Sequence, residues 1–239
     1  MSQSIGNRNQ ETFTRLANDY DKLNSLMTMG LHRHWRREAV SHLQIQPDDW
    51  VLDLAAGTGD MAMAALPYAM AGQVSLIDNN AAMLEIARQK LGNAWPSRNI
   101  AICRADGHAL PFPDHSYDKV MIGFGLRLDS SIEHTLGEAF RVLRPGGRCV
   151  SLDLSEPDSY WFKPLFKGYL QRCVPLLARL AVEKSYDYHH LPDSAKFHPD
   201  PLTVSYLFES AGFINCATKP LMRGALAVHV ADKGMKAGE

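Results

Sequence analysis

A glycine-rich turn after an apolar segment could bring a ligand close to the backbone of this chain. The segment VLDLA contains Asp53 and ends at Ala55, and Gly57, Thr58 and Gly59 follow it before an expected helix. Glycines remove Cβ atoms from such a turn, and the amides at the start of a helix face an incoming ligand. We therefore treat these five residues as candidate ligand-binding positions.

The spacing in this turn disfavours two of the ligands that glycine turns commonly hold. A dinucleotide turn follows G-x-G-x-x-G, and this chain has no glycine at position 62. The P-loop pattern G-x-x-x-x-G-K-[ST] is absent as well, and Asp60 at the helix start matches a polyphosphate poorly. A ligand that carries an ammonium group suits the nearby carboxylates better.

Two more aspartates end the next two predicted strands. Asp78, followed by Asn79, could bind both hydroxyls of a ribose through its two oxygens. Asp106 could accept a hydrogen bond from an adenine amine. A single aspartate at a strand end is often only a cap or turn residue. Asp53, Asp78 and Asp106 beside one glycine turn predict an adenosyl ligand.

The elements that would position these residues alternate along the chain. Strands are predicted at 51–55, 74–78, 100–106, 117–125 and 148–155, and helices near 60–70, 80–92, 131–142 and 200–213. Residues 214–233 predict a closing β-hairpin. This alternation predicts an α/β fold with a doubly wound, mostly parallel, Rossmann-like sheet.

Two helical regions lie outside this alternation. Residues 13–45 predict N-terminal helices with a break at Gly30, and the polar residues 1–12 before them are expected to be mobile. Residues 157–200 interleave apolar and basic side chains and predict amphipathic helices interrupted by Pro164 and Pro175. This insertion is either a helix core face or a cap over the substrate that could touch a membrane surface. Residues 1–239 are expected to form one domain.

Composition bounds the class of protein. The 239 residues carry a formal net charge of -1, whereas a nucleic-acid-binding protein usually has a basic excess. The four cysteines form no C-x-x-C pair, and His108, His115 and His198 lack metal-ligand spacing, so no metal site is predicted. The N-terminus has no secretory signal and no segment is apolar enough to span a membrane, which predicts a cytoplasmic protein.

Six segments that together cover nearly the whole chain resemble a known family. They are YDKLNSLMTMGLHRHWRR, VLDLAAGTGD, ADGHALPFPDHSYDKV, GFGLR, EAFRVLRPGGR and HPDPLTVSYLFESAGF. They resemble class I S-adenosylmethionine (SAM) methyltransferases, and more narrowly the ubiquinone/menaquinone C-methyltransferase family. The pairing of the first segment with FGLR is the most specific part. The resemblance implies SAM as cofactor and methyl transfer to a ring carbon of a polyprenyl hydroquinone.

The resemblance also assigns the cofactor side of the site. The SAM contacts of the family match Thr58, Asp78, Asp106 and Gly107. A further contact in the family is a serine, and Gly123 replaces it here, which leaves only a backbone contact. The family usually has glycine at the position of Ala56, and alanine fits there if its φ is negative.

The substrate side departs from the family pattern twice. The resemblance places Arg127 and Tyr20 near the quinol hydroxyl, but Leu128 stands where the family has asparagine and His190 where it has tyrosine. Arg127 would stabilise a phenolate, and either a water between Arg127 and Tyr20 or His190 itself would take the proton. Arg127, Tyr20 and His190 are thus the predicted catalytic residues, although each could instead have a packing or surface role.

These departures leave two alternatives open. One is an enzyme that methylates another aromatic or heteroaromatic metabolite at O, N or C. The other is a SAM-binding protein without transferase activity. For partners, the sequence predicts a small aromatic or quinol substrate and no nucleic acid. It leaves open both peripheral membrane contact and a homodimer.

Overall fold

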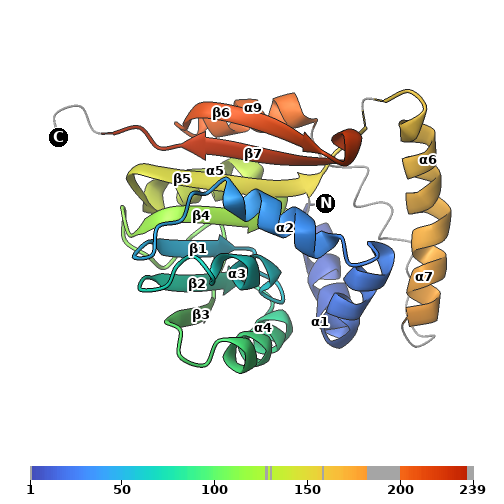
Figure 1. Ribbon diagram of the computed structural model, residues 1–239, viewed down its shortest axis with the longest axis horizontal. Helices are drawn as coiled ribbons and strands as arrows, with labels where there is room; N and C mark the ends of the chain where they lie inside the picture. The colour runs from blue at the N-terminus through green and yellow to red at the C-terminus, as the bar shows by residue number, and fades with distance from the viewer. Residues whose placement is uncertain (1, 127–128, 130, 158, 182–199, 236–239) are drawn as a thin grey trace.

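A seven-stranded sheet forms the centre of the molecule (Figure 1). The computed structural model describes residues 2–126, 129, 131–157, 159–181 and 200–235, with only the backbone of 2–13 and 178–181. The strands are β1 (Trp50–Leu54), β2 (Gln73–Asp78), β3 (Ile100–Arg104), β4 (Tyr117–Gly123), β5 (Leu143–Leu154), β6 (Ile214–Leu221) and β7 (Leu226–Asp232).

The strand order is β3-β2-β1-β4-β5-β7-β6. The first five strands in this order, β3, β2, β1, β4 and β5, are parallel to their neighbours. The strand β7 is antiparallel to both β5 and β6. The predicted doubly wound, mostly parallel sheet with a closing hairpin is therefore confirmed. Because β1 to β4 are parallel, their carboxyl ends meet at one edge of the sheet, and the turns that follow them carry most of the candidate site.

Helices cover both faces of the sheet (Figure 1). One face carries α2 (His32–Ser41), α3 (Asp60–Ala65) and α4 (Ala81–Ala94), and the other carries α5 (Ile132–Val142) and α9 (Pro201–Ser210). Val51 packs in the core of the first face and Leu52 in the core of the second. Successive strand side chains point to opposite faces, so β1 contributes to both cores.

A side chain caps the start of the helix after β2. Asn80 is the N-cap of α4, and its Oδ1 accepts hydrogen bonds from the backbone N–H groups of Ala82 and Met83 at 3.0 and 3.2 Å. These bonds satisfy two of the amides that a helix start leaves without an intrahelical partner. The cap fixes where α4 starts relative to Asp78.

The N-terminal helix is longer than the sequence predicts. α1 spans Ser2–Met27, so residues 2–12 are helical although the sequence predicts no helix there, and their mobility stays a prediction. Their polar composition carries no apolar period from which a helix could be read. The predicted break is confirmed, because Gly30 has a φ of +77° and α2 begins at His32.

The insertion after β5 forms one continuous helical rod within the described residues. It consists of α6 (Phe162–Gly168), a π-helical segment (Tyr169–Cys173) and α7 (Val174–Ala181). Pro175 does not interrupt it, contrary to the prediction, because the wider π turn relieves the usual clash of proline with the carbonyl of residue i−4. The rod stands at one edge of the molecule, beside α1 (Figure 1), and Tyr169 Oη donates a hydrogen bond to the Met27 carbonyl.

β5 begins at Leu143 rather than at the predicted residue 148. The segment with Pro145 and two glycines does end α5, but it is an irregular start of the strand rather than a separate turn. Gly146 has a φ of +77°, and the pairing of β4 with β5 shifts register between Tyr117 and Lys119. Within the described part of the chain, no helix has both the length and the apolar character of a membrane span.

Candidate functional site

The two glycines of the turn after β1 have different structural roles. Gly57 and Gly59 have φ values of +54° and +79°. A Cβ on Gly59 would lie 3.1–3.2 Å from side-chain atoms of β2 and α4, so this position must stay small for packing. A Cβ on Gly57 would meet nothing within 4 Å, so the backbone there is open to a ligand. Ala55 also has a positive φ, +58°, whereas Ala56 is not among the described residues with positive φ.

Asp78 is joined to this turn by a direct hydrogen bond. Its Oδ2 accepts from the Gly57 amide and its Oδ1 from the Asn80 amide, both at 2.8 Å. Burial raises the pKa of the Asp78 carboxyl, and the backbone N–H bonds oppose that rise. The sequence prediction that Asp78 and the glycine turn belong to one site is thus supported by their contact.

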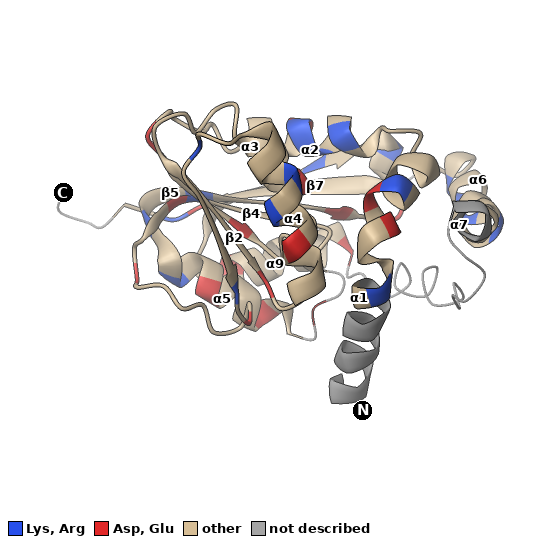
Figure 2. Ribbon diagram, turned by 90° about the horizontal axis from the view of Figure 1, so that it is seen from below, with Lys and Arg blue, Asp and Glu red and all other residues tan. Residues whose placement is uncertain are grey.

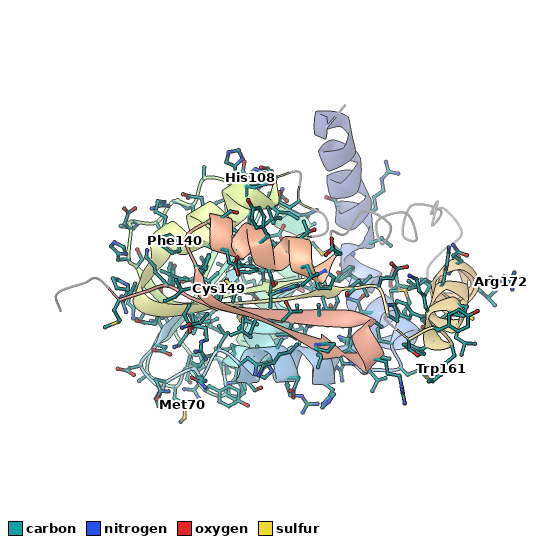
Figure 3. All side chains as sticks on the ribbon, turned by 90° about the horizontal axis from the view of Figure 1, so that it is seen from above. Met70, His108, Phe140, Cys149, Trp161 and Arg172 are labelled. Atoms are coloured by element: carbon teal, nitrogen blue, oxygen red, sulfur yellow. The ribbon has the colours of Figure 1, made fainter. Side chains whose placement is uncertain are left out.

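Asp106 lies close to Asp78 through the backbone. The amide of Ala105 donates to the Asp78 carbonyl at 3.2 Å, and the Asp106 side chain is 67% exposed. Asp106 Oδ1 accepts from the His108 amide at 3.0 Å, and His108 Nε2 lies 2.7 Å from Asp129 Oδ1. The Asp106 carboxylate is therefore exposed beside Asp78, at the position where the sequence predicts an acceptor for an adenine amine. His108, labelled in Figure 3, was assigned no role from sequence, and it positions this loop.

Asn79 and Gly107 complete this part of the edge. The Asn79 carbonyl accepts a hydrogen bond from Arg104 Nε at 2.9 Å, and the residue is exposed. A Cβ on Gly107 would be in ordinary contact with Leu54 and Thr135, at 3.5 and 3.7 Å. Both residues therefore flank the open turn, and their contact with a cofactor stays a prediction.

Asp53 is fully buried at the end of β1. Its Oδ2 accepts from the Ala62 amide at 2.9 Å, which ties β1 to α3. Its Oδ1 has no hydrogen-bond partner among the described residues. Burial raises the pKa of this carboxyl to about 8, although the Ala62 amide and the charge of Arg36 lower it. The contacts of Asp53 indicate that it holds α3 beneath the turn.

The Thr58 side chain bonds to α1. Its Oγ1 donates to Asp21 Oδ1 at 2.6 Å, and the residue is only 2% exposed. Lys90 Nζ, on α4, lies 2.7 Å from Asp21 Oδ2 and 3.3 Å from Thr58 Oγ1. Because the hydroxyl is engaged in this way, a contact of Thr58 with a cofactor would come from its backbone.

An ion cluster extends from this contact and consists of Asp21, His32, Arg36, Asp60 and Lys90. Lys90 Nζ is 2.6 Å from Asp60 Oδ1, and Asp60 Oδ2 lies 3.6 Å from Arg36 Nη2 and 3.5 Å from His32 Nδ1. The cluster connects α1, α2 and α4 to the start of α3. Asp60 therefore pairs with cations of the chain itself, and its pairing with a ligand ammonium group stays a prediction.

Gly123, the last residue of β4, faces Met61 on α3. A Cβ on Gly123 would lie 2.4 Å from Met61 Cγ, so a serine at this position would require Met61 to move. The next residue, Phe124, has a φ of +59°. The Cζ atom of Arg36 lies 5.0 Å from the centroid of the Phe124 ring. Where the family has a serine side chain at position 123, this protein therefore has glycine, and the Met61 side chain of α3 occupies that space.

The three predicted catalytic residues differ in what the structure describes. Tyr20 is part-buried on α1, next to Asp21, which contacts the glycine turn. Arg127 and His190 lie outside the described residues, as does Leu128. No group of three or more histidine, cysteine, aspartate or glutamate residues in the described ranges could hold a metal ion.

Sequence reasoning missed the ion cluster. Lys90 is 30 residues from Asp60 and 69 residues from Asp21 along the chain. No local sequence pattern pairs residues that are so far apart. One signal was available, since Lys90 and Arg36 interrupt helix faces that are otherwise buried. Charged residues on such faces are seldom buried unless they are paired.

A model of the ubiE/COQ5 methyltransferase family matches residues 1–233. The chain belongs to this family. It is therefore a methyltransferase, and the alternative of a SAM-binding protein outside the transferases is not supported. The resemblance seen in the sequence segments is confirmed.

Two curated relatives match over most of their length. The ubiquinone/menaquinone biosynthesis C-methyltransferase UbiE of Xanthomonas oryzae pv. oryzae is 38% identical over 220 residues, which is 92% of this chain and 87% of that protein. The demethylmenaquinone methyltransferase of Lactiplantibacillus plantarum is 34% identical over 228 residues, covering 95% of this chain and 96% of that protein.

A solved structure agrees with the fold of this methyltransferase. A SAM-dependent methyltransferase from Aquifex aeolicus superposes with a TM-score of 0.63 and 16% identity, covering 89% of this chain and 97% of that chain. At this identity the likeness concerns the fold alone. It agrees with the Rossmann-like sheet derived above.

Proposed function

We propose that this methyltransferase transfers a methyl group from SAM to a ring carbon of a polyprenyl hydroquinone, such as demethylmenaquinol or a ubiquinol precursor. The observation that carries the cofactor half is the hydrogen bond from the Gly57 amide to Asp78 at a turn with open space. The names and identities of the two relatives support the acceptor half. Locating the new methyl group on demethylmenaquinol tests the proposal.

The residues around the turn fit SAM. Asp78 presents a carboxylate for the ribose hydroxyls, and Asp106 an exposed acceptor for the adenine amine. The open backbone at Gly57 leaves room for the methionine end. When bound, SAM supplies a methyl group that is already activated by the sulfonium charge. The protein then has to align the acceptor, exclude water and manage one proton.

Arg127 is proposed to stabilise the negative charge of the acceptor. A hydroquinone ring carbon is a better nucleophile once a hydroxyl has lost its proton, and arginine keeps its charge in proteins. Tyr20, through a water, or His190 is proposed to receive the proton. FGLR begins at Phe124, whose amide donates to the Leu152 carbonyl at 2.7 Å. Such anchoring at the sheet edge supports a role of this segment in the site.

Arg127→Ala is expected to lower turnover about tenfold while leaving SAM affinity nearly unchanged. The reason is the loss of one charge-assisted hydrogen bond, worth about 1.5 kcal/mol, on the acceptor only. Steady-state kinetics and calorimetry with SAM measure the two quantities, with Arg33→Ala, an exposed arginine of α2, as control. Full turnover by Arg127→Ala would show that the proposed phenolate role is wrong.

A second candidate keeps the cofactor and changes the acceptor. Leu128 and His190 replace the asparagine and tyrosine of the family pattern, and both belong to the substrate side. This favours a test with other aromatic or heteroaromatic metabolites, methylated at O, N or C. Under this alternative, demethylmenaquinol would not be turned over and a smaller acceptor would be.

Peripheral membrane contact is proposed for the face that carries α6. Tyr160, Trp161 and Leu165 are 96%, 56% and 62% exposed there. Lysine and arginine residues lie along α6 and the π-helical segment after it (Figure 2), and Trp161 and Arg172 both lie on this outer rim (Figure 3). Exposed aromatic and basic side chains together suit an anionic bilayer surface. Co-sedimentation with anionic vesicles tests this contact, and the homodimer stays a prediction that sedimentation velocity can measure.

A further inference from the structure

A buried amide on α1 has no hydrogen-bond partner among the described residues. It is the side-chain Nδ2 of Asn24, which is shielded from solvent although the residue as a whole is only part-buried. The Asn24 backbone is satisfied in the usual way, since its carbonyl accepts from Thr28 Oγ1 at 2.6 Å. A buried donor without an acceptor costs stability, so it calls for an explanation.

Two contacts define the direction of α1 across the sheet edge. Midway along the helix, Thr14 Oγ1 accepts from Asn80 Nδ2 at 3.0 Å, beside the end of β2. Further along, Asp21 accepts from Thr58 in the glycine turn. α1 therefore runs from the Asp78 end of the cofactor site past the turn.

Beyond the turn, α1 reaches the helical rod. Met27 accepts a hydrogen bond from Tyr169, and α1 stands between the sheet and the rod in two views (Figures 1 and 2). Asn24 lies between Asp21 and Met27. Its backbone position is thus fixed on both sides, one by the glycine turn and one by the rod.

Helical spacing gives the direction of the Asn24 side chain. Asp21 and Ser25 belong to the face that contacts the turn and α2, where Ser25 Oγ lies 3.1 Å from His32 Nε2. At 100° per residue, Asn24 projects about 60° away from Asp21 and about 40° from Tyr20. The amide therefore lies between the docked face and Tyr20, on the far side of the turn from Asp78.

We infer that Asn24 Nδ2 donates a hydrogen bond to an oxygen of the aromatic acceptor. This inference rests on the proposed function, because it requires an oxygen-bearing ring beside the cofactor. The adenosine end of the cofactor is assigned to Asp78 and the methionine end to the turn. An acceptor must approach from beyond the turn, which is where α1 carries Asn24. An amide donor also binds the oxygen more strongly as negative charge develops on it.

Asn24→Leu tests the inference because leucine has a similar shape and no polar atoms. We expect kcat/KM for a short-chain demethylmenaquinol analogue to fall at least about tenfold, the scale of one lost hydrogen bond to a charged oxygen. The Kd for SAM should stay within about twofold, and the melting temperature of the ligand-free protein should be unchanged or raised. Asn18→Leu, at an exposed position of the same helix, is the matched control and should change none of these quantities.

Each other outcome has a distinct meaning. Unchanged kcat/KM in Asn24→Leu, with an active wild type, would overturn the inference and leave the proposed function intact. A weaker Kd for SAM with unchanged acceptor KM would also overturn it, because the amide would then bind the cofactor. A melting temperature lowered by several degrees would indicate a purely structural role. An inactive wild type would contradict the proposed function itself.

Discussion

Replacing Asp78 with alanine is expected to weaken SAM binding by about a hundredfold. A carboxylate that accepts from both ribose hydroxyls makes two charge-assisted hydrogen bonds, and each is worth about 1.5 kcal/mol or more. The same carboxylate accepts from the Gly57 and Asn80 amides, so its loss also loosens the turn that faces the cofactor. Isothermal titration calorimetry with SAM measures the effect.

A milder substitution of Asp78 and a control substitution elsewhere, on α4, accompany this test. Asp78→Asn keeps one side-chain oxygen and should give an intermediate affinity. Glu85→Ala, at an exposed position of α4, should bind SAM as the wild type does. An unchanged affinity in Asp78→Ala would show that the cofactor is not bound at this edge of the sheet.

Asp60→Asn is expected to lower the free energy of unfolding by about 3 kcal/mol at neutral pH. Removing one partner of a buried ion pair leaves the other charge without compensation, at a cost of about 3–5 kcal/mol when burial is complete. Arg36 and Lys90 side chains are 7% and 21% exposed, so the lower end applies. Urea denaturation measures it, with Asp48→Asn in the exposed turn before β1 as control.

The pH dependence of this variant carries a second test. Burial alone would raise the pKa of Asp60, but His32, Arg36 and Lys90 together hold it below its ordinary value of 3.8. A depressed folded pKa contributes stability above the unfolded pKa and loses it as the carboxylate protonates at lower pH. The difference between wild type and Asp60→Asn should thus be constant from about pH 5 to 8 and shrink below about pH 4. A wild type no more stable than Asp60→Asn at pH 7 would contradict the account of the ion cluster.

The strands were predictable because their side chains enter two cores. Val51 and Leu52 point to opposite faces, and apolar runs of this kind are typical of parallel strands buried on both sides. The helix over residues 2–12 could not be read, because its composition is polar and shows no apolar period. The continuity of α6 and α7 through Pro175 could not be read either, since a π turn has no sequence signature of its own.

The candidate site divides in the same way. Asp78 and Gly57 were predicted together from topology alone, because consecutive parallel strands end at one edge. The partners of Thr58 and Asp60 were not predicted, since they come from α1, α2 and α4. Asn24 was missed for the same reason, because the burial of one amide depends on how helices pack.

The most direct test of the central claim is an acceptor assay with methyl-labelled SAM. Demethylmenaquinol analogues are compared with small phenols and heteroaromatics, and mass spectrometry locates the new methyl group. The account predicts that label appears on a ring carbon of the demethylmenaquinol analogue, and that Asp78→Ala reduces it at subsaturating SAM. Label on an oxygen or nitrogen, or only on a small phenol or heteroaromatic, would contradict the proposed function.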